Sequence, residues 1–157
     1  MVLRISETLL EQIRQHGQRT YPDECCGALL GVAGEDGTKE VRALLPLDNR
    51  REGEAARTRF LVTAEDYRTA ERAARDQGME IVGFYHSHPD HPARPSEFDR
   101  EHALPWYSYL VVRVAGGAPQ EATSWVLADD RSQFLQEEMR SRAEPDRRAR
   151  TGTDLSG

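Results

Sequence analysis

The sequence of 157 residues contains only two cysteines and no long apolar run. Cys25 and Cys26 are adjacent, which is not the spacing of a disulfide framework, so we expect a reducing, cytoplasmic setting. No apolar stretch approaches the length of about 18 residues that spans a membrane, and the N-terminus has no apolar signal core. These absences predict a protein with no membrane partner.

Positive charge is also scarce. Asp and Glu number 27 against 21 Lys and Arg, which leaves a formal net charge of −6. A general nucleic-acid binder needs clustered basic side chains to contact phosphates, so this class is disfavoured. The length predicts a single domain, which we place over residues 1–139. Residues 140–157 are polar and charged without apolar periodicity, and we expect them to form a disordered tail.

What the sequence does contain is a dense group of polar residues after an apolar segment. Residues 81–85 have the composition of a buried strand, and His86 and His88 follow directly where the strand is expected to meet a loop. Side chains two residues apart in an extended chain point to the same side, so both imidazoles can reach one metal ion. A stiff, proline-rich loop then leads to Ser96, the expected N-cap of a helix that carries Asp99 in its first turn.

This segment has two competing interpretations. An isolated His-x-His is more often solvated than bound to metal, and Ser-x-x-Asp is more often an ordinary capping box. A carboxylate that binds metal is also less free to reach back to the Ser96 amide. The coincidence of both patterns in one run favours a metal site. His86, His88 and Asp99 would leave the fourth position of a zinc ion open, as catalytic zinc requires.

Together these residues resemble a known family. His86-Ser87-His88-Pro89 followed by Pro95-Ser96-Glu97-Phe98-Asp99 is similar to the signature of the JAMM (MPN-plus, Mov34) zinc metallopeptidases. The family also has an upstream glutamate, a position that Glu24 in Pro-Asp-Glu-Cys-Cys-Gly matches. The Glu-Cys-Cys-Gly string and the Trp-Tyr-Ser-Tyr of residues 106–109 resemble the compact prokaryotic branch. The resemblance spans residues 6–134, and no matched motif position departs from the pattern.

The resemblance implies one Zn²⁺ per chain, held by His86, His88 and Asp99. Zinc lowers the pKa of a coordinated water to roughly 7. Glu24 is then the expected catalytic base, which takes the proton of the water and returns it to the leaving amine. To act as a base Glu24 must be ionised, which a nearby zinc ion favours. Ser96 is expected to donate to the oxyanion, and its role as a cap acceptor leaves its proton free to do so.

The expected substrate also follows from the resemblance. Family members cleave peptide or isopeptide bonds after the C-terminal diglycine of ubiquitin or ubiquitin-like proteins. The short chain leaves no room for long linkage-reading insertions, so we expect a small ubiquitin-like sulfur-carrier protein as the partner. The alternatives are a non-catalytic module that binds ubiquitin-like tails and a zinc amidohydrolase for small molecules. A zinc nucleoside deaminase is disfavoured because its Pro-Cys-x-x-Cys is missing. Whether the chain forms a homodimer is left open.

Other polar residues are less informative. Asn49 lies in the polar segment of residues 47–57, which either forms a plain loop or borders the substrate cleft. His91 could be a fourth ligand, but this would close the open metal position, so we expect it at the rim of the cleft. His102 either supports Asp99 from the same helix face or is an ordinary exposed histidine. The two cysteines are most simply buried strand residues.

The expected fold is α/β, with a mixed, mainly antiparallel sheet flanked by helices. The resemblance implies the more specific arrangement of a deaminase-like α-β-α sandwich. Capping residues and apolar periodicity predict helices over residues 6–16, 64–77, 96–103 and 132–139, and strands over residues 26–32, 41–45, 58–62, 79–85, 107–114 and 124–127.

Overall fold

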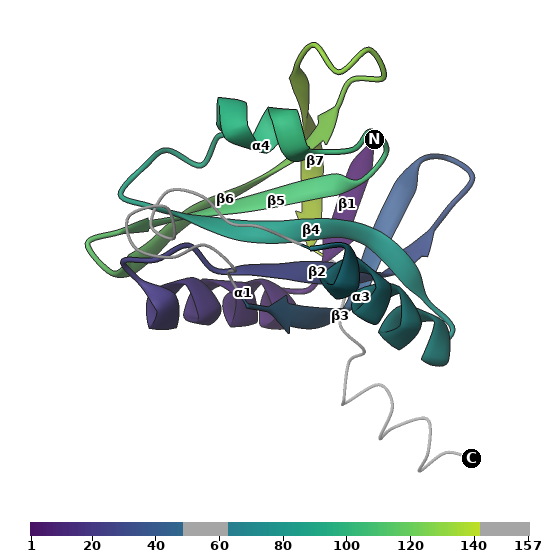
Figure 1. The fold of residues 1–157 in the computed structure, drawn as a ribbon, viewed down its shortest axis with the longest axis horizontal. Coiled ribbons are helices and arrows are strands. Elements are labelled where there is room, and N and C mark those ends of the chain that lie inside the picture. The colour runs from purple at the N-terminus through teal and green to yellow at the C-terminus, as the bar shows by residue number, and fades with distance from the viewer. Residues whose placement is uncertain (49–62, 142–157) are drawn as a thin grey trace, which may run out of the picture.

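The computed structural model describes residues 1–48 and 63–141 (Figure 1). Asn49, the predicted strand of residues 58–62 and residues 142–157 of the predicted tail lie outside the described residues, whereas residues 140 and 141 of that tail belong to a strand. Along the chain the elements are β1 (Val2–Ile5), α1 (Glu7–Thr20), β2 (Cys26–Ala33), β3 (Thr38–Leu47), α3 (Ala64–Asp76), β4 (Glu80–Pro89), α4 (Glu97–His102), β5 (Ser108–Ala115), β6 (Ala118–Leu127) and β7 (Phe134–Ser141).

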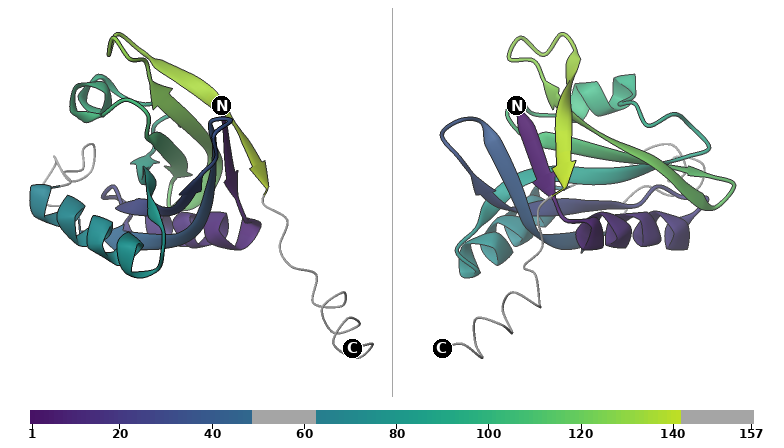
Figure 2. Two further views of the ribbon diagram at one scale, coloured as in Figure 1. Left: turned by 90° about the vertical axis from the view of Figure 1, so that its right-hand side faces the viewer. Right: turned by 180° about the vertical axis from the view of Figure 1, so that it is seen from behind.

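The strands of the described residues form one closed sheet in the order β1-β3-β2-β4-β5-β6-β7. Its pairs are antiparallel except for β4 with β5, β1 with β3 and β1 with β7. The prediction of a mixed, mainly antiparallel α/β fold is therefore confirmed. The predicted flanked sandwich needs correction, because β1 pairs on both sides and closes the sheet into a barrel. The two views of Figure 2 show how the sheet curves round.

Both strands that close the barrel differ from the sequence prediction. β1 was not predicted from the sequence, and it ends at Ile5, directly before the predicted start of the first helix. The predicted helix over residues 132–139 is wrong, because β7 occupies this segment and pairs with β6 and β1. Its residues Gln136, Glu138 and Met139 favour a helix locally, but the two open strand edges satisfy the backbone hydrogen bonds of an extended chain, and this tertiary pairing outweighs propensity.

The helices begin where local capping predicts. The hydroxyl of Ser6 accepts from the Leu9 amide at 3.1 Å and caps α1, which packs Leu10, Ile13 and Gly17 inward and continues four residues beyond the predicted end. α1 contacts β4, β5 and β6, whereas α3 contacts β4 and β2. In Figure 1, α4 lies above the sheet and α1 below it. Among the described residues, no helix combines the length and the apolar character needed to cross a bilayer.

A β-bulge in β4 decides which way its polar residues face. Leu29 of β2 pairs with Gly83 and Leu30 pairs with Ile81, so Val82 is an extra residue on β4. Ile81 and Phe84 therefore join one buried cluster with α3, while Val82 and Tyr85 join the cluster under α1. Alternation beyond the bulge carries the histidines at positions 86 and 88 to the face of Phe84. The bulge thus places them opposite α1.

Candidate metal centre

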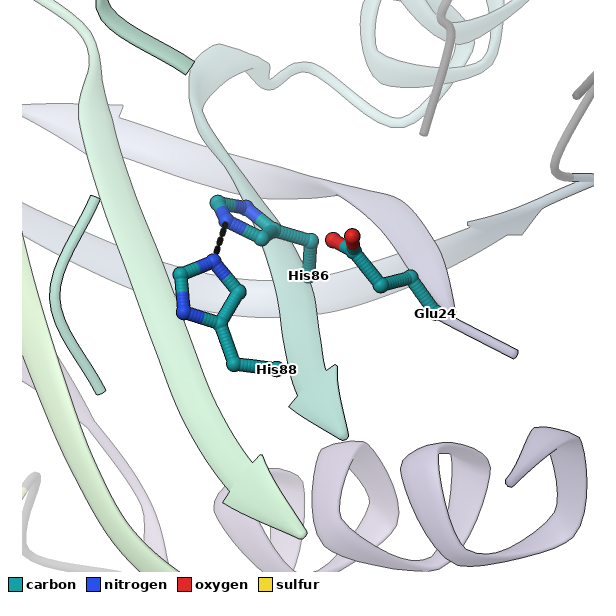
Figure 3. A group of neighbouring side chains, drawn as sticks. All are labelled: Glu24, His86 and His88. Carbon is teal, nitrogen blue, oxygen red and sulfur yellow. Dashed lines mark hydrogen bonds between the residues drawn. The ribbon is translucent and has the colours of Figure 1, made fainter. Parts of the chain in front are cut away.

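The two histidines converge at the end of β4. The strand continues to Pro89, so His86 and His88 lie within it and not in the loop that the sequence suggested. Their Nε2 atoms are 3.1 Å apart, and the two side chains are 1% and 8% exposed. Figure 3 shows both rings on one side of the strand, with the carboxylate of Glu24 pointing toward them.

Asp99 reaches the same point from α4. Ser96 is the N-cap of this helix, and its hydroxyl accepts from the Asp99 amide at 3.1 Å. The Oδ2 atom of Asp99 accepts in return from the Ser96 amide at 2.8 Å, and it lies 3.1 Å from Nε2 of His86 and 3.2 Å from Nε2 of His88. The oxygen that accepts from the Ser96 amide is therefore the same one that lies beside both rings, so capping does not draw Asp99 away from the histidines.

The hydrogen bonds of His88 determine which of its ring nitrogens can bind a cation. Its Nδ1 lies 2.8 Å from the carbonyl oxygen of Pro92, which can only accept, so Nδ1 carries a proton. In the neutral ring Nε2 then presents a lone pair toward the Asp99 oxygen. Two acceptors 3.2 Å apart repel each other unless a proton or a cation lies between them. The proline-rich loop thus fixes the tautomer of His88 that binds a metal ion through Nε2.

The spacing of the three atoms fits zinc. Tetrahedral zinc with nitrogen and oxygen ligands at about 2.0 Å has ligand atoms about 3.3 Å from one another. The distances within His86, His88 and Asp99 are 3.1 to 3.2 Å. Two imidazoles and one carboxylate are also a donor set that zinc prefers. The residues present therefore fit the ion that the sequence predicts.

The electrostatic setting favours the ionisation states that bind metal. Burial lowers the pKa of His86 against the opposing influence of Asp99, so the ring stays neutral. Burial alone would raise the pKa of Asp99, but the neighbouring His86 and the hydrogen bond from the Ser96 amide hold it well below its ordinary value of 3.8. Asp99 is consequently a carboxylate at neutral pH.

Glu24 lies two residues before β2, the strand that pairs with β4, and its carboxylate points toward the histidines (Figure 3). It is 1% exposed, and its carboxylate groups with His86 and His88 so that one ligand atom from each lies within 4.8 Å of the others. Burial, and secondarily the charge of Asp99, raises the pKa of Glu24 to about 9. Two overlapping trios therefore share the histidine pair, one completed by Asp99 and one by Glu24. The Asp99 trio is the more compact.

A cleft of about 200 Å³ opens beside the cluster. Its described walls combine the site residues His86 and Asp99 with apolar and aromatic side chains, among them Tyr67, Phe84 and Leu104. His102 also lines the cleft, where it stacks on Phe98 with ring centroids 4.1 Å apart. His91 is exposed and is not among the described lining residues, so its role in substrate binding stays a prediction.

The structure confirms that both cysteines are buried residues. Cys25 and Cys26 are free thiols, 2% and 0% exposed, in the segment that follows Glu24. Burial raises the pKa of Cys25 to about 11 and that of Cys26 further, so neither thiol ionises near neutral pH. They pack as small apolar residues.

Sequence reasoning missed the residues that tie these segments together. The backbone amide of Cys25 donates to the hydroxyl of Ser87 at 2.8 Å, and the amide of Ser87 donates to the carbonyl of Cys25 at 3.1 Å. Asp90 accepts from the hydroxyl of Tyr21 at 2.6 Å and from the amide of Gly116 at 2.7 Å. No local pattern could indicate these contacts, because they join residues 26 to 69 positions apart.

Comparison with known proteins agrees with this geometry. The family described as prokaryotic homologs of the JAB domain matches residues 6–128. The chain belongs to this family. This match confirms the resemblance recognised from Glu24, the His-x-His-Pro and the Ser-x-x-Asp of the sequence.

Individual relatives cover most of this JAB-family chain. A desampylase from Haloferax volcanii is 33% identical over 106 residues, which is 67% of this chain and 73% of that protein. A CysO-cysteine peptidase from Mycobacterium tuberculosis is 30% identical over 129 residues, which is 82% of this chain and 84% of that protein. The solution structure of a protein from Salinibacter ruber is 47% identical with a TM-score of 0.70, covering 93% of this chain and 94% of that one.

Proposed function

We propose that the protein is a zinc-dependent metallopeptidase that hydrolyses the bond after the C-terminal diglycine of a ubiquitin-like protein of the sulfur-carrier type. The observation that carries the proposal is the convergence of two imidazole nitrogens and one carboxylate oxygen within 3.2 Å beside a cleft, with a second carboxylate adjacent. The names of two relatives, a desampylase and a CysO-cysteine peptidase, support a substrate of this kind. The cytoplasmic setting expected from the sequence stays a prediction.

His86, His88 and Asp99 would hold the zinc ion. When bound, zinc supplies Lewis acidity, which makes water acidic enough to lose a proton near neutral pH and polarises a carbonyl group. Ser96 keeps the Asp99 oxygen in place through its amide, and the Pro92 carbonyl keeps the ring of His88 in its metal-binding tautomer. Both contacts orient ligands before any ion arrives, so little reorganisation is required on binding.

Glu24 is the base in this proposal. It takes a proton from the attacking water and gives it to the nitrogen that leaves. Its raised pKa of about 9 describes the protein without an ion, and a positive charge near it would favour the carboxylate. Burial then serves catalysis, because a carboxylate that is poorly solvated holds its proton more readily once it has received it.

Ser96 has the exposure and the hydrogen bonds needed for a donor to the oxyanion. Its Oγ accepts from the Asp99 amide, and its hydroxyl proton is available for the substrate, since a serine hydroxyl donates once and accepts twice. Removing one such donor typically costs about a hundredfold or more in kcat. We therefore propose that this hydroxyl donates a hydrogen bond to the scissile carbonyl oxygen as negative charge develops on it.

The test is intact-mass spectrometry of a ubiquitin-like sulfur carrier extended beyond its diglycine and incubated with the zinc-loaded protein. We expect a mass loss that ends at the second glycine, and no loss with Glu24→Gln. Glu35→Gln, in the exposed turn between β2 and β3, is the matched control and should cleave like the wild type. An unchanged mass with the wild type, at one zinc per chain, would contradict the proposal and favour a binding module or a small-molecule amidohydrolase.

A further inference from the structure

The Glu24 segment and the histidine strand are connected at two points. Ser87, which lies between the two histidines, binds both backbone groups of Cys25 at 2.8 and 3.1 Å. Beyond His88, the carboxylate of Asp90 accepts from the hydroxyl of Tyr21 at 2.6 Å. In the first segment, Tyr21 and Cys25 lie on either side of Glu24 in the sequence. In the second, Ser87 and Asp90 lie on either side of His88. Contacts between the two segments therefore flank both Glu24 and His88.

Asp90 is well placed to fix one of these segments on the other. It follows β4 directly and adopts a left-handed φ of 59°, a conformation that aspartate tolerates better than most residues. Its amide donates to the carbonyl of Val114 at 2.8 Å, and its Oδ1 accepts from the amide of Gly116 at 2.7 Å. The residue is thus held by the hairpin between β5 and β6, and its second oxygen remains for Tyr21.

The segment that contains Tyr21 transmits this constraint to Glu24. Tyr21 ends α1 with its amide bonded to the carbonyl of Gly17 at 3.1 Å. The next turn is tight, because the Asp23 amide donates to the Thr20 carbonyl at 2.8 Å and the Thr20 hydroxyl donates to the Asp23 carbonyl at 3.0 Å. A displacement of Tyr21 would therefore move Glu24, which lies outside any helix or strand.

We propose that Asp90 is a positioning residue that holds the Glu24 segment, residues 21–25, against the strand that carries the metal ligands. Asp90 does not touch the reacting atoms. It acts through Tyr21 on the distance between Glu24 and the histidine pair. The catalytic consequence rests on the proposed function, but the structural connection does not. A displacement of about 1 Å at a catalytic group can cost about a hundredfold in rate, so a surface hydrogen bond can matter for turnover.

The variant that removes the connection is Asp90→Ala. With the wild type as reference, we expect kcat on the diglycine substrate to fall by about ten- to a hundredfold, while KM and the zinc stoichiometry stay the same. Asp90→Asn should restore most of kcat, because its amide can keep the Gly116 contact and a tyrosine hydroxyl can accept as well as donate. Tyr21→Phe should fall between the wild type and Asp90→Ala.

Hydrogen exchange supplies a readout that does not depend on activity. In Asp90→Ala the amides of residues 21–25 should exchange faster than in the wild type, with and without zinc, and in Asp90→Asn they should not. The control is Asp36→Ala, which removes another exposed turn aspartate whose Oδ1 accepts from the Thr38 amide at 3.0 Å. This variant should change neither kcat nor exchange in residues 21–25.

The outcomes separate the two proposals. If the amides of residues 21–25 exchange at the same rate in Asp90→Ala as in the wild type, Asp90 does not hold this segment, whatever the activity of the variant. Faster exchange with wild-type kcat overturns the positioning role. A wild-type protein that cleaves no diglycine substrate overturns the proposed function, while the exchange data still decide whether Asp90 fixes this segment.

Discussion

Replacing Glu24 with glutamine should stabilise the metal-free protein at neutral pH, although it removes the proposed base. Burial and the charge of Asp99 raise the pKa of Glu24 from 4.5 to about 9. The native side chain therefore keeps its proton over a pH range in which the unfolded chain has lost it. From pH 4.5 to 7 this difference lowers the free energy of unfolding by about 1.4 kcal/mol per pH unit, or about 3 kcal/mol altogether.

The stability that Glu24 contributes should change with pH in one direction only. A carboxyl with a raised native pKa contributes its full stability below pH 4.5 and progressively less as the pH rises toward 9. Glutamine has nearly the same shape and no charge at any pH, so Glu24→Gln should lack this slope. We expect the two proteins to be about equally stable near pH 4.5 and to differ by about 3 kcal/mol at pH 7 in favour of the variant.

The assay is urea unfolding of chelator-treated protein, followed by tryptophan fluorescence at several values between pH 5 and pH 8. Groups common to both proteins cancel when the two profiles are subtracted, which isolates Glu24. Glu35→Gln should follow the wild type within about 0.5 kcal/mol, as most surface substitutions do. Zinc should reduce the advantage of the variant, because the ion favours an ionised Glu24. If the free energies of unfolding of wild type and Glu24→Gln change with pH in parallel without metal, Glu24 does not have a raised pKa in the native protein.

Three further substitutions test the scaffold. Gly83→Ala should lower stability by about 2 kcal/mol or more in urea unfolding, because its Cβ would lie 2.0 Å from the Ser108 carbonyl oxygen. Gly78→Ala, at a φ of 70° in open space, should cost only about 1 kcal/mol, and equal costs would contradict the close approach of β4 to β5. Burial, followed by Arg19, lowers the pKa of His16 below 6.5, so the contribution of His16 to stability should fall as the pH drops below 6.5, in the opposite direction to that of Glu24. His16→Gln should therefore gain stability relative to the wild type between pH 7.5 and 5, and parallel profiles of the two proteins would show that His16 makes no such contribution.

The sequence was most informative where the determinants are local. Ser6 and Ser96 cap helices through hydrogen bonds to amides three residues on, so short patterns predict them. His86, His88 and Asp99 lie within one run of fourteen residues, and the loop between them is stiffened by proline. The candidate ligands could therefore be named, and the structure brings all of them together.

What the sequence did not reveal depends on distant parts of the chain. The strand β7 forms because it can pair with the free edges of β6 and β1. The residues 134–141 themselves contain no pattern that indicates these partners. The extra residue Val82 turns the histidines to their face of the sheet, and alternation alone does not locate such a bulge. The contact of Asp90 with Tyr21 joins residues 69 positions apart.

The most direct test is the zinc stoichiometry of four proteins, measured by native mass spectrometry after reconstitution with one equivalent of Zn²⁺. We expect one ion in the wild type, one in Glu24→Gln and none in Asp99→Ala, because Asp99 completes the ligand set and Glu24 acts beside it. His88→Ala, which leaves the Ser96 cap intact, should also bind none. Zinc retained by Asp99→Ala and lost from Glu24→Gln would contradict the account and assign the ion to Glu24, His86 and His88.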